Sequence, residues 1–255
     1  MVRHSLFYCQ LWQMNDTSSF FEANRQGWNQ CTRVHTKSAF YDVAGFKQGK
    51  SSLNQPELNA LGDVSGKTLL HLQCHFGQDT LSWARAGAIV TGIDFSEEAI
   101  STAKSLAAEL QLPAQFICCN VYDTLQHIQP HFDIVFTSYG VIGWLPDLDQ
   151  WAQVISDALQ PGGTFYMIEF HPVVWMLDDN CERITYPYYN ASVIVTEQQG
   201  TYTDRNAPIQ FKEYSWNHSI SEVLNALIRH GLVIQEFNEY MYSCYNCFNN
   251  MVQGP

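Results

Sequence analysis

Residues 69–96 read LLHLQCHFGQDTLSWARAGAIVTGIDFS. The apolar run over 68–72 is typical of a buried strand, and the segment after it predicts a helix over about 78–86 that ends at Gly87. A second apolar run, AIVTGI, predicts another strand that ends in Asp94. This order of strand, helix and strand indicates a βαβ unit with parallel strands. The turn before the helix offers unpaired backbone N–H groups, so we expect a ligand to bind there.

The same alternation of strands and helices continues along the chain. Ser96 can cap the next helix, and the sequence PGG at 161–163 predicts a turn before the fifth strand. Further strands are expected over 115–118, 132–137, 164–170 and 232–237, and further helices over 96–110, 148–159 and 219–230.

These elements predict the α/β class, with a doubly wound, mostly parallel sheet and helices on both faces. One core is expected for 255 residues, so we treat the chain as a single domain. Its expected parts are a helical and loop cap over 1–60, a core over 65–170, an aromatic-rich insertion over 171–216, and a C-terminal helix and strand over 217–255.

Charge and hydropathy argue against several classes of partner. The 13 basic residues are scattered and the net charge is −12, which disfavours nucleic acid and anionic membranes. No apolar run reaches the roughly 18 residues of a membrane span, and the first residues lack the pattern of a signal peptide. We therefore expect a cytoplasmic protein; its oligomeric state stays open.

The eight cysteines are expected to be reduced thiols, because a chain of this size needs no disulfides in the cytoplasm. Cys244 and Cys247 form a lone CxxC without a second CxxC or a nearby pair of histidines. We therefore predict no metal site.

Asp94 is the first residue whose chemistry suggests a ligand. It follows Gly77 by 17 residues and ends the second strand, beside the turn after the first strand. A carboxylate only accepts hydrogen bonds, so it suits the two hydroxyl donors of a ribose. The pattern predicts that Asp94 binds the ribose of a nucleotide-like cofactor.

The order and spacing of further motifs resemble the class I methyltransferases that use S-adenosylmethionine, over about residues 65–240. Asp94 and Phe95 match the ribose and adenine positions, CNVYD at 119–123 is similar to the third motif, and LQPGGTFYMIE at 159–169 resembles the fifth strand and the turn before it. FDIVFTSYG at 132–140 is similar to the fourth strand. The resemblance implies a Rossmann-like fold, a small-molecule methyl acceptor, and cofactor contacts from Gln73, Cys74, His75, Gly77, Asp94, Phe95, Asn120, Val121 and Ser138.

The first motif departs from the family pattern of one acidic residue and three alternating glycines. This chain has His71, Gln73, His75 and Gly77 at these positions, so only the last glycine is present. We expect Gln73 and His75 to adopt ordinary backbone angles and to take part in the cofactor site. A neutral His71 cannot replace a carboxylate, and Asp79, on the following helix, is a possible substitute.

Other residues are expected on the rim of the site. The N-terminal residues Trp28, Tyr41 and Lys50 are candidates for closing over the cofactor, with ordinary packing as the alternative. The family sheet ends with an antiparallel strand, which is either missing here or formed in abbreviated form by residues 240–245.

Methyl transfer depends mainly on alignment, so few catalytic residues are needed. His171, at the carboxyl end of the fifth strand, is the first candidate for a general base, and His218 is the second. Tyr139 could line the transfer site. The aromatic insertion predicts the wall or lid of an apolar pocket, and Asp178 and Asp179 leave an amine acceptor open.

Two alternatives to a methyltransferase remain at this stage. A nucleotide-dependent oxidoreductase also has an acid after the second strand, but QCHFGQ lacks two glycines of its GxGxxG fingerprint. The second alternative is a binding module whose altered first motif has lost cofactor affinity. Calorimetry with S-adenosylmethionine, S-adenosylhomocysteine and NAD distinguishes the three readings.

Overall fold

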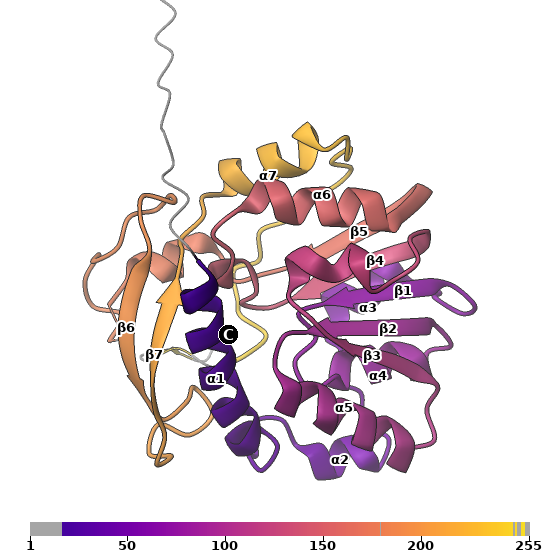
Figure 1. Cartoon of the computed structure of the whole chain (residues 1–255), viewed down its shortest axis with the longest axis horizontal. Coiled ribbons are helices and arrows are strands. Elements are labelled where there is room, and N and C mark those ends of the chain that lie inside the picture. Colours follow the sequence, from indigo (N-terminus) through magenta and orange to yellow (C-terminus); the bar gives the residue numbers. More distant parts are fainter. Residues whose placement is uncertain (1–16, 179, 247, 249–250, 253–255) are drawn as a thin grey trace, which may run out of the picture.

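A computed structural model describes residues 17–178, 180–246, 248 and 251–252. Its centre is a five-stranded sheet in the order β3-β2-β1-β4-β5, and every neighbouring pair of strands is parallel (Figure 1). The strand order reverses between β1 and β4, which is where ligands of open parallel sheets bind. The predicted fold class is confirmed. The strands are β1 (Thr68–Leu72), β2 (Ile89–Asp94), β3 (Ala114–Cys118), β4 (Phe132–Ser138) and β5 (Leu159–Ile168).

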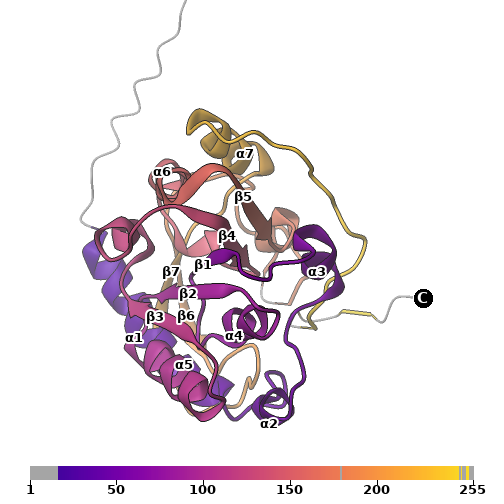
Figure 2. The same cartoon turned by 90° about the vertical axis from the view of Figure 1, so that its right-hand side faces the viewer.

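Helices cover both faces of the sheet because its strands are apolar on both sides (Figure 2). Leu69 and Leu70 of β1 point to opposite faces: Leu69 packs with Trp83 and Leu70 with Trp151, and all four side chains are fully buried. One face carries α3 (Gln55–Leu61), α4 (Gln78–Arg85) and α5 (Glu97–Glu109); the other carries η1 (Val121–Gln126), α6 (Leu148–Ala158) and α7 (Ile220–Arg229).

The helix cap expected at Ser96 forms, and the structure adds a second cap at Ser219. The Ser96 side chain accepts a hydrogen bond from the Ala99 N–H at 3.1 Å and starts α5. Ser219 and Glu222 form a capping box at the start of α7. No helix in the described ranges combines the length and apolar character needed to cross a bilayer.

The N-terminal segment and the insertion form a second layer beside the sheet (Figure 1). Asn24 of α1 holds the insertion through two hydrogen bonds with the backbone of Tyr214, at 2.7 and 2.9 Å, and Phe20 stacks on the Tyr214 ring. These contacts join the N-terminal helix to the insertion. The elements here are α1 (Ser18–His35), α2 (Val43–Lys47), η2 (Ile142–Trp144), η3 (Pro172–Met176), and the antiparallel pair β6 (Ile194–Gln199) and β7 (Gln210–Ser215).

The strand expected over 232–237 is absent, and of the two possibilities left open for the final strand the abbreviated one does not form. Residues 232–237 form no strand: after α7 the chain runs along the outside of the molecule past α3, and Val233 and Phe237 are exposed (Figure 2). Residues 240–245 form no abbreviated final strand either. Neither segment pairs with β5, so an apolar composition alone did not produce a strand there.

The PGG sequence lies inside β5 rather than before it. Leu159 pairs with Phe132 and Thr164 with Ile134, so the glycines form an irregularity within the strand. Gly162 has a φ of +82°, which a residue with a side chain rarely adopts. The β5 strand therefore begins five residues earlier than expected and bends at its start.

Gly92 of β2 occupies a position without space for a side chain. A Cβ atom there would lie 2.7 Å from the Phe116 ring and 2.9 Å from Cys74 Sγ. We expect Gly92→Ala to lower the free energy of unfolding by about 1–3 kcal/mol, the usual cost of overpacking. Urea denaturation measures this difference.

Gly143→Ala is the matched control, because the nearest atom to its Cβ would be Trp216 O at 3.7 Å, an ordinary contact. Its free energy of unfolding should change by no more than about 0.5 kcal/mol. Equal losses in the two variants would contradict the packing argument.

Candidate functional site

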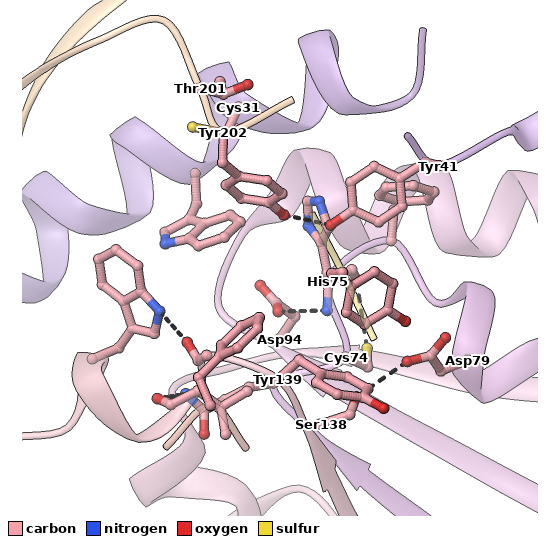
Figure 3. Close-up of a pocket in the computed structure, with 18 of the residues that line it drawn as sticks. Cys31, Tyr41, Cys74, His75, Asp79, Asp94, Ser138, Tyr139, Thr201 and Tyr202 are labelled. Carbon is pink, nitrogen blue, oxygen red and sulfur yellow. Dashed lines mark hydrogen bonds between the residues drawn. The ribbon is translucent and has the colours of Figure 1, made fainter. Parts of the chain in front are cut away.

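A cavity of about 630 Å³ opens at the carboxyl ends of β1, β2 and β4, below α1 and the insertion (Figure 3). Its volume is typical of a small-molecule site. The structure brings all eleven predicted cofactor residues to its wall: Trp28, Tyr41, Gln73, Cys74, His75, Gly77, Asp94, Phe95, Asn120, Val121 and Ser138.

The loop after β1 has a left-handed backbone at alternate residues. The φ angles are +56° at Gln73, +52° at His75 and +80° at Gly77. The expectation of ordinary angles at Gln73 and His75 is therefore wrong: the loop keeps the conformation for which glycine is suited. Left-handed angles cost a residue with a side chain on the order of 1–2 kcal/mol, and the Gln73 side chain offsets part of this cost by donating a hydrogen bond to Val141 O at 2.9 Å.

Gly77 is glycine for a second reason. It is the N-cap of α4, and a Cβ atom on it would lie 2.7 Å from the Phe116 ring. Backbone angle and close packing both exclude a side chain at Gly77, whereas the side chains of Gln73 and His75 have room to reach partners at Val141 and His35. This difference explains why the last of the three glycines is present.

His75 links the loop to the N-terminal helix. Its Nε2 lies 2.9 Å from Nδ1 of His35, and its ring packs edge-on against Trp28 and Tyr41. Burial lowers the pKa of His75 well below its usual value and the pKa of His35 to about 3. Both rings are neutral at physiological pH, so one nitrogen donates and the other accepts.

Asp94 ends β2 with a buried carboxylate that faces the cavity (Figure 3). Its Oδ2 accepts from the His75 N–H at 2.8 Å and its Oδ1 from the Ser96 N–H at 2.9 Å. Burial raises the pKa of Asp94 to about 6, against the lowering effect of these hydrogen bonds. Each oxygen has a further lone pair, so the carboxylate can still accept from a ligand's hydroxyl groups.

The neighbouring wall is largely apolar. Phe95 and Val121 line the cavity beside Asp94, and Asn120 caps η1 by accepting a hydrogen bond from the Tyr122 N–H at 3.1 Å. Apolar walls flanking a hydrogen-bonding carboxylate suit a flat ring attached to a sugar.

On the other side of Cys74, four polar residues form a chain. His71 Nδ1 lies 2.8 Å from Thr80 Oγ1, and His71 Nε2 lies 3.4 Å from Ser138 Oγ, which donates to Asp79 Oδ2 at 3.1 Å. Burial lowers the pKa of His71 to about 3, so the ring is neutral. The carboxylate next to the end of β1 thus comes from Asp79 on α4 (Figure 3).

Tyr139 lines the cavity and leads to a carboxylate that sequence reasoning missed. Its hydroxyl donates to Glu57 Oε1 at 3.0 Å and accepts from Asn54 Nδ2 at 3.1 Å. Glu57 is fully buried on α3, its Oε2 has no partner among the described residues, and burial raises its pKa. The sequence does contain a signal for this burial. Glu57 precedes the apolar Leu61 by four residues, so the two side chains share the buried face of that helix.

The loop after β4 is held by a second missed carboxylate. Glu169 accepts backbone hydrogen bonds from Gly140, from Val141 at 2.8 Å, from Ile142 at 3.3 Å and from Phe170 at 2.7 Å. Its place at the end of β5 mirrors that of Asp94 at the end of β2. The signal in the sequence for this role was an acidic residue at the end of a strand, next to a loop that contains glycine.

Aromatic residues form much of the outer wall. Tyr41 and Tyr202 share a hydrogen bond of 2.5 Å between their hydroxyl groups, and Trp175 also lines the cavity. Lys50 lines it too and forms an ion pair with Asp42 at 2.9 Å. Five other tyrosine and tryptophan residues of the insertion do not line the cavity: Tyr186, Tyr188, Tyr189, Tyr214 and Trp216.

The structure places neither candidate histidine on the cavity wall. His171 is half-exposed, caps η3, and its Nε2 lies 2.7 Å from Glu239 Oε1. His218 is buried, with Nε2 2.7 Å from Leu145 O, and burial lowers its pKa. Of the three residues proposed for catalysis, Tyr139 alone reaches the cavity.

Two sequence features remain partly untested. Among the described residues no group of three or more His, Cys, Asp or Glu side chains is arranged to hold a metal ion, and Cys247 lies outside them. Asp178 lines the cavity, and its Oδ1 accepts from the Glu182 N–H at 2.9 Å. Asp179 lies outside the described residues.

Comparison with known proteins shows similarity to methyltransferases over part of the chain. Residues 70–165 match the family model described as a methyltransferase domain. The chain is 29% identical over 130 residues to an uncharacterized methyltransferase of Synechocystis sp., covering 50% of this chain and 59% of that protein. It is 27% identical over 146 residues to the ubiquinone biosynthesis O-methyltransferase of Photorhabdus laumondii, covering 55% of this chain and 60% of that protein. The chain thus spans about three fifths of these curated relatives.

A solved structure agrees with the fold. The S-adenosylmethionine dependent methyltransferase from Mesorhizobium loti superposes with a TM-score of 0.50 at 23% identity, covering 74% of this chain and 84% of that one. The family-model match runs from within β1 to within β5 and includes the loops after β1, β2 and β4.

The left-handed backbone at Gln73 makes a testable prediction about stability. Gln73→Gly and Gln73→Ala both remove the hydrogen bond to Val141 O, so the two variants differ mainly in backbone preference. With φ at +56°, the glycine variant should be the more stable by about 1 kcal/mol. Chemical denaturation of the pair gives the difference.

The sign of this difference is decisive. At a residue with ordinary angles alanine is the more stable by about 0.5–1 kcal/mol, because glycine loses more entropy on folding. An alanine variant more stable than the glycine variant would show that the loop does not hold the left-handed angle.

Proposed function

We propose that this chain, whose residues 70–165 match a methyltransferase domain, is a class I methyltransferase that binds S-adenosylmethionine in the cavity and methylates a small molecule. The observation that carries the proposal is the position of Asp94. Its carboxylate lies at the tip of β2, beside the left-handed loop after β1 and at the reversal of strand order. A nucleoside with two free ribose hydroxyls is the ligand that this acceptor suits.

The cavity residues also fit the rest of such a cofactor. Gln73 Oε1 is buried without a partner among the described residues, so an acceptor is available on the loop. Phe95 and Val121 offer apolar surface for a base. Aromatic rings around the cavity, including Trp28 and Tyr202, suit a positively charged sulfur through cation–π attraction of roughly 0.5–2 kcal/mol.

When bound, the cofactor supplies a methyl group on a positively charged sulfur, activated for in-line displacement. The chain has to hold the acceptor in line with that methyl group and to exclude water. The layer made by α1 and the insertion provides the enclosure. Catalysis of this kind requires alignment more than reactive side chains.

The acceptor is proposed to lie against Tyr139 and the aromatic wall formed by Phe170, Trp175 and Tyr245. Burial raises the pKa of Tyr139, so the phenol is protonated at neutral pH and already donates to Glu57. In this proposal Tyr139 orients the acceptor, and no step is assigned to His171 or His218. A net charge of −12 supports a small molecule over nucleic acid.

Isothermal calorimetry with S-adenosylmethionine, S-adenosylhomocysteine and NAD tests the cofactor. We expect the first two to bind and NAD to give no heat. Asp94→Asn should weaken S-adenosylhomocysteine binding by about 1.5–3 kcal/mol, the scale of hydrogen bonds to a charged group. Incubation of cell extract with methyl-labelled cofactor, followed by mass spectrometry, then identifies the acceptor.

Glu98→Gln is the control for charge, since Glu98 belongs to the first turn of α5 and lies outside the cavity wall. This variant should bind like the wild type. Wild-type affinity in a folded Asp94→Asn variant would remove the basis of the proposal.

The raised pKa of Asp94 predicts a pH dependence of binding. Ribose hydroxyls donate to the charged carboxylate, so affinity should be constant above pH 7 and fall by up to about tenfold per pH unit below the pKa of about 6. Binding near pH 6 should therefore release protons, which calorimetry in buffers of different ionisation heat detects.

Nearby groups do not produce the same profile. The pKa of His75 lies well below its usual value and that of Cys74 well above, so neither changes charge near pH 6. The pKa of Asp79 is also raised, so Asp94→Asn is needed to separate the two carboxylates. A wild-type profile that stays flat down to pH 5, or one that is unchanged in Asp94→Asn, would contradict the assignment.

A further inference from the structure

We propose that Asp79, on the first turn of α4, is the counter-charge for the ammonium group at the amino-acid end of the cofactor. The inference rests on the proposed function and deepens it. It assigns to this helix the charge that the end of β1 lacks, and it makes Asp79 a determinant of which adenosine compounds bind.

The end of β1 carries no anion. His71 occupies that position, and its ring nitrogens lie within reach of Thr80 and Ser138 hydroxyls. Because burial lowers the pKa of His71 to about 3, the ring is neutral and cannot pair with a cation as a carboxylate does. A positively charged ligand group entering here needs its partner from another element.

Asp79 lies where it can pair with such a positively charged group. It lines the cavity and accepts a hydrogen bond from Ser138 Oγ at 3.1 Å, so its carboxylate is one hydroxyl group away from His71. Among the described residues it makes no ion pair with Lys, Arg or His. Burial raises its pKa, which means that the carboxylate is desolvated without a compensating cation.

The two cavity carboxylates define the ends of a ligand. In Figure 3 Asp94 and Asp79 lie on opposite sides of Cys74, with the left-handed loop between them. A molecule that carries ribose hydroxyls at one end and an ammonium at the other spans this loop. S-adenosylmethionine and S-adenosylhomocysteine both have this arrangement, whereas 5′-methylthioadenosine has the ribose without the amino acid.

Other acidic groups near the cavity are less suited. Glu57 is held by Tyr139 and Asn54 beneath the wall, and Asp178 is occupied by backbone N–H groups of the insertion. Asp94 anchors the His75 backbone. Asp79 is the carboxylate that faces the space next to the loop from the α4 side.

A purely structural role for Asp79 is the competing explanation, because an acidic residue in the first turn of a helix stabilises the helix dipole. That role affects unfolding and does not depend on which ligand is bound. Ligand selectivity therefore distinguishes the two roles.

The test is calorimetry of wild type and Asp79→Asn with S-adenosylhomocysteine and with 5′-methylthioadenosine. Removing the charge should lower the affinity for S-adenosylhomocysteine by roughly 10- to 100-fold, the loss expected for a hydrogen bond to a charged group. The affinity for 5′-methylthioadenosine should fall by less than about twofold. A circular-dichroism melt of each variant reports the fold. Equal losses for both ligands, or no loss for either, would overturn the inference.

Asp149→Asn is the matched control, since Asp149 holds the equivalent first-turn position of α6 and pairs with Arg229 away from the cavity. It should change neither affinity. Should Asp79→Asn fail to fold, the wild type still decides: an analogue of S-adenosylhomocysteine without the α-amino group must bind at least about tenfold more weakly. Equal affinity of the wild type for that analogue would also overturn the inference. A wild type that binds none of these adenosine compounds would instead refute the proposed function itself.

Discussion

The hydrogen bond from the His75 N–H to the Asp94 carboxylate is the interaction on which the cavity depends. It joins the loop after β1 to the tip of β2 at 2.8 Å, in a region from which water is largely excluded. A buried carboxylate is costly to leave unpaired, so the two backbone donors at His75 and Ser96 hold it in one orientation. The same bond fixes the path of the loop that leads into α4.

Similar hydrogen bonds from backbone N–H groups to a carboxylate hold the opposite wall of the cavity. Glu169 at the end of β5 accepts backbone N–H groups from the loop after β4, in which Tyr139 has a φ of +50°. Non-glycine residues with such angles persist where their surroundings over-determine them, and they gather at functional sites. In both loops a carboxylate at the end of a strand binds backbone N–H groups of the loop. These hydrogen bonds hold the residues with left-handed angles in place and also shape the wall of the cavity.

Sequence patterns predicted the helices, strands and caps that depend on neighbouring residues in the chain. They missed features that depend on which other segments a residue contacts in the fold. The cap at Ser96 follows from capping chemistry, and the buried strands from their apolar runs. Residues 232–237 have a similar composition yet no neighbour to pair with, so they are not a strand. The residues predicted to contact the cofactor came from motif order, whereas the hydrogen bond between Glu57 and Tyr139 is a tertiary contact that no local pattern encodes. His171 illustrates the converse: a strand-end position alone did not bring it to the cavity.

The side chains at positions 73 and 75 explain how the loop works without its glycines. A glycine loop is held only by its backbone, whereas here Gln73 ties the loop to the β4 side through Val141 and His75 ties it to α1 through His35. Each tie yields a net stabilisation of about 0.5–1.5 kcal/mol, which is comparable with the cost of a left-handed angle. The strain is therefore offset where it arises, and the loop, α1 and the β4 wall form one connected surface around the cavity. When α1 is ordered, the loop is also stabilised, and the reverse holds, because the two segments share the contact between His35 and His75.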